Sequence, residues 1–253
     1  AELLCSRMNS KNSATLSMGG VIGKIEATSG EIDGKGNIVN YATISSNHGQ
    51  YNNQYTAIGG VIGETKCSVK GVVNEGSANY IIGEDGAVYK HIWVGGVVGY
   101  IRNGVIDGCT YLNGRMNDSG FCNSYGGGIV GVCERCTVNN CTATADIHSS
   151  TGGSGYPRCG GIVAWARKST ISNCSFYGNL TYAANGTYDD FCGGILALAE
   201  DDECVVKDSR YGGSVNGVTV SANNCLDYAV GVASLGKFES SPTVTGITYW
   251  NGK

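Results

Sequence analysis

The residue types that carry chemistry are present in this chain, but few of them are grouped. The clearest cluster is the acidic run Glu200-Asp201-Asp202-Glu203, with Asp189-Asp190 shortly before it. Such carboxylates can supply part of the roughly six to eight oxygen ligands that calcium takes. A catalytic role would also need a basic side chain to abstract a proton, and no column of Arg or Lys accompanies these acids. We interpret the run as a solvated turn, with a structural calcium site as the alternative and catalysis as the weakest interpretation.

Histidine chemistry has as little support. His48, His91 and His148 stand alone, and the metallopeptidase pattern His-Glu-x-x-His does not occur. The formal net charge of −4 and the isoelectric point near 5.4 lack the basic stripe that a nucleic-acid partner requires. No apolar run approaches the roughly 18 residues that span a bilayer. We therefore predict no enzyme: no catalytic residue, no cofactor, no metal ligand set, no nucleic-acid partner and no membrane-spanning segment.

An internal repeat is the dominant feature of the sequence. A pentad of two glycines, two aliphatic residues and a Gly or Ala occurs six times, and Val230-Gly231-Val232-Ala233-Ser234 is a decayed seventh copy. The second glycines of the six pentads are Gly20, Gly60, Gly96, Gly128, Gly161 and Gly194. With Gly231 they are separated by 40, 36, 32, 33, 33 and 37 residues. Such a period is typical of stacked coils, each of which adds a strand to a parallel sheet.

A second block follows each pentad and begins with Ile or Val. Its copies start at Ile38, Val69, Ile106, Val138, Ile171, Val206 and Val244. The third position holds residue types that tolerate a left-handed backbone, namely Asn40, Gly71, Gly108, Asn140, Asn173, Asp208 and Gly246. Each coil is therefore expected to bend there, between two inward side chains. The inward residues that follow the bend form one predicted buried column: Tyr41, Val72, Cys109, Cys141, Cys174, Ser209 and Ile247.

The composition fits a packed core, since 42% of the residues are hydrophobic and only 15% are charged. Short segments rich in β-branched residues, separated by Gly and Asn, indicate strands. We predict an all-β fold, a right-handed parallel β-helix (β-solenoid) of about seven coils with 32–40 residues per coil. Residues 1–253 are expected to form one domain, in which 1–18 are an N-terminal return segment or cap and 19–253 carry the repeats.

The cysteines divide into two groups. Their number, 12, is high and even, which favours an oxidising compartment. Cys109, Cys141 and Cys174 are neighbours in the predicted column and cannot all pair, so we expect small buried hydrophobic residues there. Cys159 and Cys192 each precede a Gly-Gly, one coil apart. Their expected Cα separation suits a disulfide, so they are the candidate bridge between coils.

The pentads, and blocks such as Ile171-Ser172-Asn173-Cys174, resemble GLUG-type repeats from Gly19 to Gly252. Repeats of this type occur in surface and secreted proteins of bacteria, in adhesin-like chains and in some secreted peptidases. The resemblance implies an extracellular or cell-surface location and a role as a stalk or binding surface, and it carries over no catalytic residue. We expect a structural or adhesive protein that assembles with itself or binds surface glycans.

Two aromatic columns bear on glycan binding. The first lies two residues after the buried column and holds Tyr111, Phe176, Tyr211 and Tyr249. The second, one residue further on, holds Tyr177 and Trp250. Facing outward, either would form a strip that stacks on sugars; facing inward, it would pack under the return loops, which is the interpretation we favour.

Two further surfaces are expected from strand alternation. The outward column after the bend would be an ice-binding ladder if it were all Thr, but Val73 and Arg210 interrupt it. Its members are Ala42, Val73, Thr110, Thr142, Ser175, Arg210 and Thr248. The two aliphatic positions of each pentad should point to opposite faces, leaving one apolar strip outside for cover by loops or by another chain.

The ends of the chain bear on self-assembly. Residues 1–18 amount to about one return segment, and the chain stops at Asn251-Gly252-Lys253, where the next would start. An open stack exposes strand edges and core unless it is capped, and Ala1-Glu2-Leu3-Leu4-Cys5 is a candidate cap. We expect head-to-tail stacking into a filament, a contact that propagates rather than closes. A module cut from a longer repeat protein is the alternative.

Overall fold

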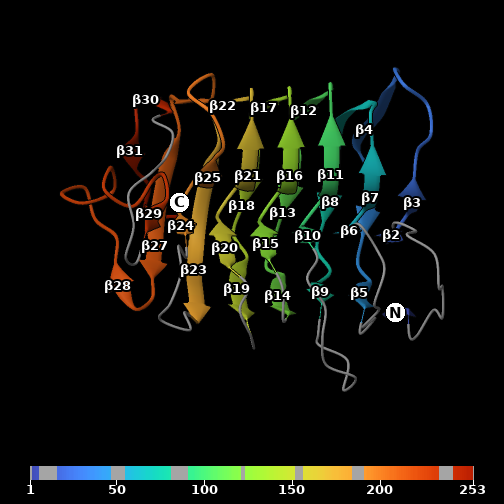
Figure 1. Ribbon diagram of the computed structural model, residues 1–253, viewed down its shortest axis with the longest axis horizontal. Helices are drawn as coiled ribbons and strands as arrows, with labels where there is room; N and C mark the ends of the chain where they lie inside the picture. The colour runs from blue at the N-terminus through green and yellow to red at the C-terminus, as the bar shows by residue number, and fades with distance from the viewer. Residues whose placement is uncertain are drawn as a thin grey trace.

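The computed structural model describes residues 2–5, 16–46, 55–80, 91–120, 123–151, 156–183, 191–233 and 242–252. Every regular element in this part of the chain is a β-strand, and the strands stack as a parallel β-solenoid (Figure 1). The colour in Figure 1 runs along the stack from blue at one end to red at the other, so consecutive coils are neighbours. Nothing among the described residues forms a helix that could cross a membrane.

Three sheets form the sides of the coil. The first sheet contains β2 (Leu16–Gly19), β6 (Tyr55–Gly59), β10 (His91–Gly95), β15 (Ser124–Gly127), β20 (Pro157–Gly160), β24 (Phe191–Gly193) and β29 (Val232–Ala233). The second sheet contains β3 (Ile22–Lys24), β7 (Ile62–Thr65), β11 (Val98–Arg102), β16 (Val130–Glu134), β21 (Val163–Arg167) and β25 (Leu196–Ala199). The large sheet wraps the rest of each coil and holds the remaining 18 strands.

The strands of the large sheet follow the second block and the return of each coil. They are β1 (Glu2–Cys5), β4 (Glu31–Asn40), β5 (Thr43–Ser46), β8 (Ser68–Asn74), β9 (Ala78–Tyr80), β12 (Val105–Asp107), β13 (Thr110–Tyr111), β14 (Arg115–Gly120), β17 (Thr137–Asn139), β18 (Thr142–Ala143), β19 (Asp146–Thr151), β22 (Thr170–Ser172), β23 (Ser175–Ala183), β26 (Val205–Lys207), β27 (Arg210–Val215), β28 (Val218–Thr219), β30 (Thr243–Thr245) and β31 (Thr248–Tyr249). The N-terminal strand β1 extends this sheet by pairing in parallel with β5.

About four turns, between Tyr55 and Ala183, are regular, with strands parallel to those on both sides. The first turn departs from this pattern because β4 carries a bulge, in which residues 34–37 lie opposite Gly71 alone. The last turn departs because β28 and β29 pair antiparallel with β27 and β24. The repeat thus produces the stacked coil, and its regularity is greatest where the spacing is 32 or 33 residues.

The pentads stack in register. The first glycines Gly59, Gly95 and Gly127 are Cα partners, and Gly160 and Gly193 continue the row. The second glycines make room in two directions. A Cβ on Gly96 would lie 2.1 Å from the Gly128 carbonyl oxygen of the next coil and 2.2 Å from the Tyr111 ring. The pentad therefore requires glycine both for the close approach of coils and for a large side chain in the core.

The decayed seventh pentad is placed differently from the prediction. Val230, not Ala233, bridges to Leu196, so Tyr228 occupies the place expected for Gly231. The Gly194 amide accordingly donates to the Tyr228 carbonyl. A chain with Tyr at this position cannot repeat the close glycine contact, which is where the parallel stacking of the first sheet ends.

The two aliphatic residues of each pentad do not point to opposite faces. Val97 and Val98 are both fully buried in the core, as are the corresponding pairs of the four other pentads from Val61 to Leu196. The chain bends between β10 and β11 at this point, and the amides of both valines donate to the Ile129 carbonyl. The expected outer apolar strip is therefore absent in these coils, because the pentad is a corner and not a straight strand.

The bend in the second block is found where the sequence predicts it in six coils. Its residues have φ of 50–65° at Gly71, Gly108, Asn140, Asn173, Asp208 and Gly246. In the first coil the predicted position of the block is wrong. Ile32, not Ile38, pairs with Val69, and the positive φ of this coil is at Lys35 and Gly36, inside the bulge.

The predicted positions of Asn40 and Tyr41 are wrong for the same reason. Asn40 is buried, and its Nδ2 donates to Asn74 Oδ1 at 2.9 Å, so it belongs to a polar ladder inside the coil. Tyr41 is 69% exposed, so it lies outside the predicted column. Ile38-Val39 resembles the start of a block in sequence, but the block starts at Ile32, before the bulge.

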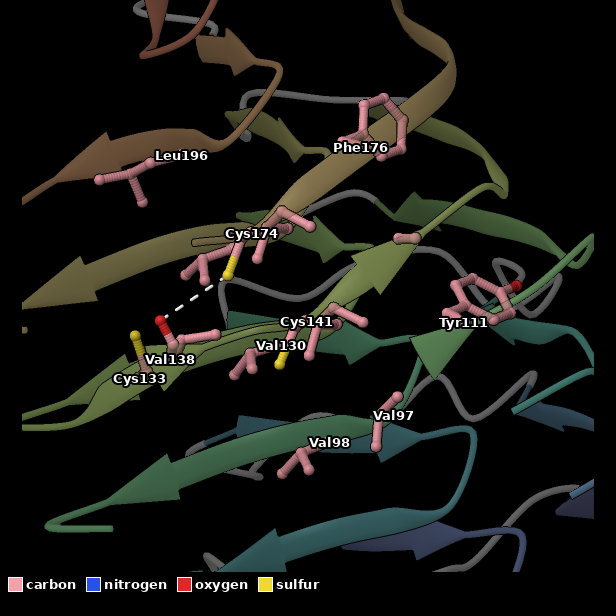
Figure 2. Packing of buried hydrophobic residues seen from close by; sticks show 14 of the residues in the cluster. Val97, Val98, Tyr111, Val130, Cys133, Val138, Cys141, Cys174, Phe176 and Leu196 are labelled. Atoms are coloured by element: carbon pink, nitrogen blue, oxygen red, sulfur yellow. Dashed lines mark hydrogen bonds between the residues drawn. The ribbon is translucent and has the colours of Figure 1, made fainter. Parts of the chain in front are cut away.

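The rest of the buried column is confirmed. Val72, Cys109, Cys141 and Cys174 are fully buried, Ser209 is 1% exposed, and Ile247 packs against the core from a partly buried position. Figure 2 shows Cys141 and Cys174 among the core valines, with Cys174 Sγ donating to the Val138 carbonyl at 3.7 Å. These thiols behave as small core side chains that also satisfy backbone carbonyls.

The predicted bridge between Cys159 and Cys192 has the right register but no bond. The two residues are Cα partners on β20 and β24, and both are buried. No disulfide joins any of the ten cysteines whose side chains the structure describes. The regular hydrogen bonding between these strands holds the coils without a covalent link.

Gly128→Ala tests the coil contact. Its Cβ would lie 2.0 Å from the Gly161 carbonyl oxygen, and backbone cannot swing aside as a flexible side chain can. We expect a loss of about 3 kcal/mol or more in the free energy of unfolding, measured by chemical denaturation. Gly108→Asn is the matched control, because a Cβ there meets nothing within 4 Å and Asn occupies the same bend at Asn140 and Asn173. Equal losses in both variants would contradict the explanation.

Thiol labelling tests the cysteine columns. Burial raises the pKa of Cys136 and of Cys204 to about 11 and that of Cys141 above its ordinary value. Because the thiolate is the reactive form, we expect none of these three to be alkylated in the native protein at pH 8, and all of them after unfolding. Mass spectrometry of tryptic peptides locates the label. Tyr41→Cys, at an exposed position, should react at once; native labelling of Cys141 would refute the assigned burial.

Candidate functional site

A second hydrophobic cluster lies outside the coil, separate from the core. Its buried members are Ala57, Tyr100, Tyr125, Val132 and Ala164, and its partly exposed members are Tyr55, Trp93 and Trp165. We call it the outer aromatic cluster. It spans the corner between the first and second sheets, and its side chains point away from the core. Trp93 shows why: it alternates with Ile92 and Val94, which both face the core.

The corner is sharp enough to bring rings from the two sheets together. A Cβ on Gly99 would lie 2.6 Å from the Ile58 amide nitrogen, so the backbones of β11 and β6 nearly touch there. As a result Tyr100 of β11 meets Trp93 of β10 with ring centroids 4.7 Å apart. Tyr55 stacks on the same indole at 4.0 Å with an interplanar angle of 19°. Three aromatic rings thus pack together at the corner, where Tyr55 and Trp93 are partly exposed and Tyr100 is buried.

The row continues through polar groups along the first sheet. His91 Nδ1 and the Tyr125 hydroxyl are 3.2 Å apart and share a hydrogen bond. The Arg158 guanidinium carbon lies 4.8 Å from the Tyr125 ring centroid and 5.3 Å from that of Tyr156, in cation–π contacts. From Tyr55 on β6 to Arg158 on β20 the row crosses three inter-strand spacings, about 14 Å at roughly 4.8 Å each. It is an extended surface, not a compact pocket.

The electrostatics of the row depend on burial and on the charged groups near its two ends. His91 keeps an exposed edge, but its partial burial lowers the pKa of the imidazole, and the positive Arg158 lowers it further, so the imidazole is neutral at pH 7. Burial raises the pKa of the Tyr100 hydroxyl above its ordinary value, so it stays protonated. The row therefore offers partly exposed aromatic rings and neutral hydrogen-bonding groups, with the Arg158 cation at one end and the Glu64 carboxylate beside Tyr100 at the other.

The acidic run is occupied by structural contacts. The Lys168 amide donates to both carboxylate oxygens of Asp201 at 3.1 Å, and Lys168 Nζ pairs with Glu203 at 2.5 Å. Arg167 pairs with Glu200 at 3.5 Å. Within the described ranges, no three His, Cys, Asp or Glu side chains are grouped to hold a metal ion. Asp189-Asp190 and His48 lie outside the described residues.

The aromatic column predicted from the repeat faces inward. Tyr111, Phe176 and Tyr211 are fully buried in the main core, above the second glycines, and only Tyr249 is exposed. In the next column Tyr177 is 38% exposed and meets Trp250 edge-on at 6.2 Å. Neither column forms a strip for stacking on a ligand. The first packs into the core itself and not under return loops.

The column tested for ice binding is in register except at its start, where Val39 and not Ala42 lies beside Val73. Thr110, Thr142 and Ser175 lie side by side on neighbouring strands. Arg210 comes next, and its Nε donates to Ser175 Oγ at 2.7 Å. The ladder is therefore short and interrupted.

Sequence reasoning missed the outer aromatic cluster, although a signal exists. The residue two places before each first glycine reads Ser17, Ala57, Trp93, Tyr125, Arg158 and Phe191. Strand alternation puts this column on the outside, opposite the inward Met18, Ile58, Val94, Cys159 and Cys192. What the sequence could not show is that the second sheet turns back far enough for Tyr100 to join it.

Comparison of the chain with family models, with curated proteins and with solved structures finds no match in any of the three. The geometry of the outer aromatic cluster is therefore the basis for assigning a function.

Acid titration tests the environment of His91. Its pKa is lowered in the folded protein, so the unfolded chain takes up a proton first as the pH falls below about 6.5. We expect the free energy of unfolding to decrease between pH 6.5 and pH 5, and to decrease less in His91→Gln. Burial and Arg115 lower the pKa of His148 too, so His148→Gln should remove a further part of the slope. Identical slopes in wild type and His91→Gln would show that His91 is not desolvated.

Proposed function

We propose that this protein is a non-enzymatic extracellular or cell-surface module that binds carbohydrate along the outer aromatic cluster. The observation that carries the proposal is the stacked Tyr55–Trp93–Tyr100 group, held outside the core at the corner of two sheets. The surface location rests on the resemblance of the repeats to GLUG-type repeats. The solenoid serves as a rigid scaffold that presents the row.

Carbohydrate fits this row better than a protein partner does. The apolar C–H faces of a sugar ring stack on aromatic rings, while its hydroxyls need hydrogen-bonding groups at the side, here the His91 imidazole and the Tyr125 hydroxyl. A stable protein interface covers about 800 Å² per partner around an apolar centre. Two of the ring systems, Tyr100 and Tyr125, are already buried, which leaves a narrow strip instead of a broad apolar patch.

We also propose that the solenoid is right-handed and has seven coils, counting the irregular turns at both ends. Parallel strands joined by a crossover are right-handed in about 98% of cases, because of the strand twist. The six pentads and the rearranged seventh supply the coils. Assembly of this protein with itself, as a structural element, is the second candidate function; the repeat resemblance favours it, and size in solution tests it.

A glycan array followed by calorimetry tests the carbohydrate proposal. We expect the wild-type protein to bind an oligosaccharide of several sugar units, and Trp93→Ala to weaken the binding at least about tenfold, equivalent to about 1.4 kcal/mol. Tyr41→Ala is the control, because that ring is 69% exposed and lies outside the cluster. Equal effects of the two substitutions, or no binding to any glycan, would reject the proposal. Binding of a protein that Trp93→Ala abolishes would replace it by a protein-docking role.

A further inference from the structure

We infer that Arg158 makes the outer aromatic cluster selective for sugars that carry an anion, either a carboxylate or a sulfate. This inference rests on the proposed function and deepens it. The chemistry concerned is a charge-assisted hydrogen bond between the guanidinium and an oxyanion next to a stacked sugar ring.

Arg158 is a partly buried cation, and no acid among the described residues pairs with it. Its Nε and Nη1 are shielded from solvent and have no hydrogen-bond partner, and no ion pair to Arg158 occurs within the described residues. Its only described contacts are with the faces of Tyr125 and Tyr156. Leaving donors of a charged group unsatisfied costs free energy, so an unpaired guanidinium of this kind calls for an explanation. Nε and Nη1 face the protein, whereas Nη2 is not among the shielded atoms and is the nitrogen open to an anion at the surface.

The other described arginines differ from Arg158 in their partners or in their exposure. Arg102, which is also partly buried and lies on the second sheet, likewise has a shielded Nε without a hydrogen bond, but this atom is ion-paired with Glu134 at 3.4 Å. Arg167 has Glu200 at 3.5 Å, and Arg210 donates to Ser175 as well as lying over the Trp250 ring. Arg115 and Arg135 have no described ion pair, but they are exposed, so water satisfies them.

Arg158 lies where it can contact a ligand bound along the row. It lies at the far end of the row from Tyr55, and the Tyr125 ring against which it packs is hydrogen-bonded to His91. Its positive charge acts on other residues of the row, since it contributes to the lowered pKa of His91. No carboxylate within the described ranges pairs with Arg158 to offset this charge, and an anion on a bound sugar would do so. If Arg158 served only to pack against the tyrosine rings, the protein would bind charged and neutral sugars with equal affinity.

Three oligosaccharides of the same β-1,4-glucan backbone provide the probes: neutral, oxidised at C6 to the carboxylate, and sulfated at C6. Calorimetry at low salt gives the affinity of each for the wild-type protein, Arg158→Gln, Arg158→Lys and Arg115→Gln. We expect the wild type to prefer at least one anionic glucan over the neutral one by about tenfold. The preference should vanish in Arg158→Gln, return in part in Arg158→Lys, which keeps the charge without the planar fork, and persist in Arg115→Gln. The carboxylate and sulfate arms identify the anion.

The outcomes separate this inference from the proposed function. If Trp93→Ala weakens binding of all three glucans but the wild type does not prefer an anionic one, the carbohydrate site stands and the role of Arg158 is overturned. A preference that survives in Arg158→Gln with an unchanged unfolding midpoint also overturns it. If no glucan binds and the glycan array is blank, the proposed function itself has failed.

Discussion

The structure depends on the absence of a side chain at the second glycine of each pentad. At Gly60, Gly96, Gly128 and Gly161, a Cβ would lie 2.0–2.1 Å from the carbonyl oxygen of the next coil. Only glycine allows this approach, and the approach sets the register of every strand that follows in the coil. In the stacked corners the side chains of both following aliphatic residues are buried in the core, because the chain turns between them.

The same glycines decide what the interior holds. The residue opposite each one in the large sheet lies against the space that a Cβ would occupy, and this column reads Asn40, Asn74, Tyr111, Ala143, Phe176 and Tyr211. The aromatic rings are core residues for this reason, although tyrosine at a strand position also suits a surface. At the N-terminal end the same space is used by an amide ladder, in which Asn74 Nδ2 donates to the Gly96 carbonyl at 2.6 Å.

The outer aromatic cluster is a consequence of the corner and not of the stack alone. Stacking places like positions side by side along the axis, so Trp93, Tyr125 and Arg158 are neighbours. Closure of the corner at Gly99 adds Tyr100 from the second sheet. The strands that carry these residues are hydrogen-bonded to a neighbouring strand on each side, so the backbone under the proposed binding surface is rigid. Rigid presentation lowers the entropy that a ligand must lose with its receptor.

The sequence by itself determined the all-β class, the period of the coil, the bend at Asn140 and Asn173, and the burial of Cys109, Cys141 and Cys174. These follow from residue types that recur at one spacing, which is information local to each repeat. The first coil was beyond reach, because the bulge at residues 34–37 is visible only when β4 is laid against β8. Whether Tyr111 packs into the core or under the return loops, and whether Tyr100 joins Trp93, were also beyond reach, since alternation along one strand does not show what covers its face. Only the tertiary structure decided them, through the contact between coils at the second glycines and the closeness of the two sheets at Gly99.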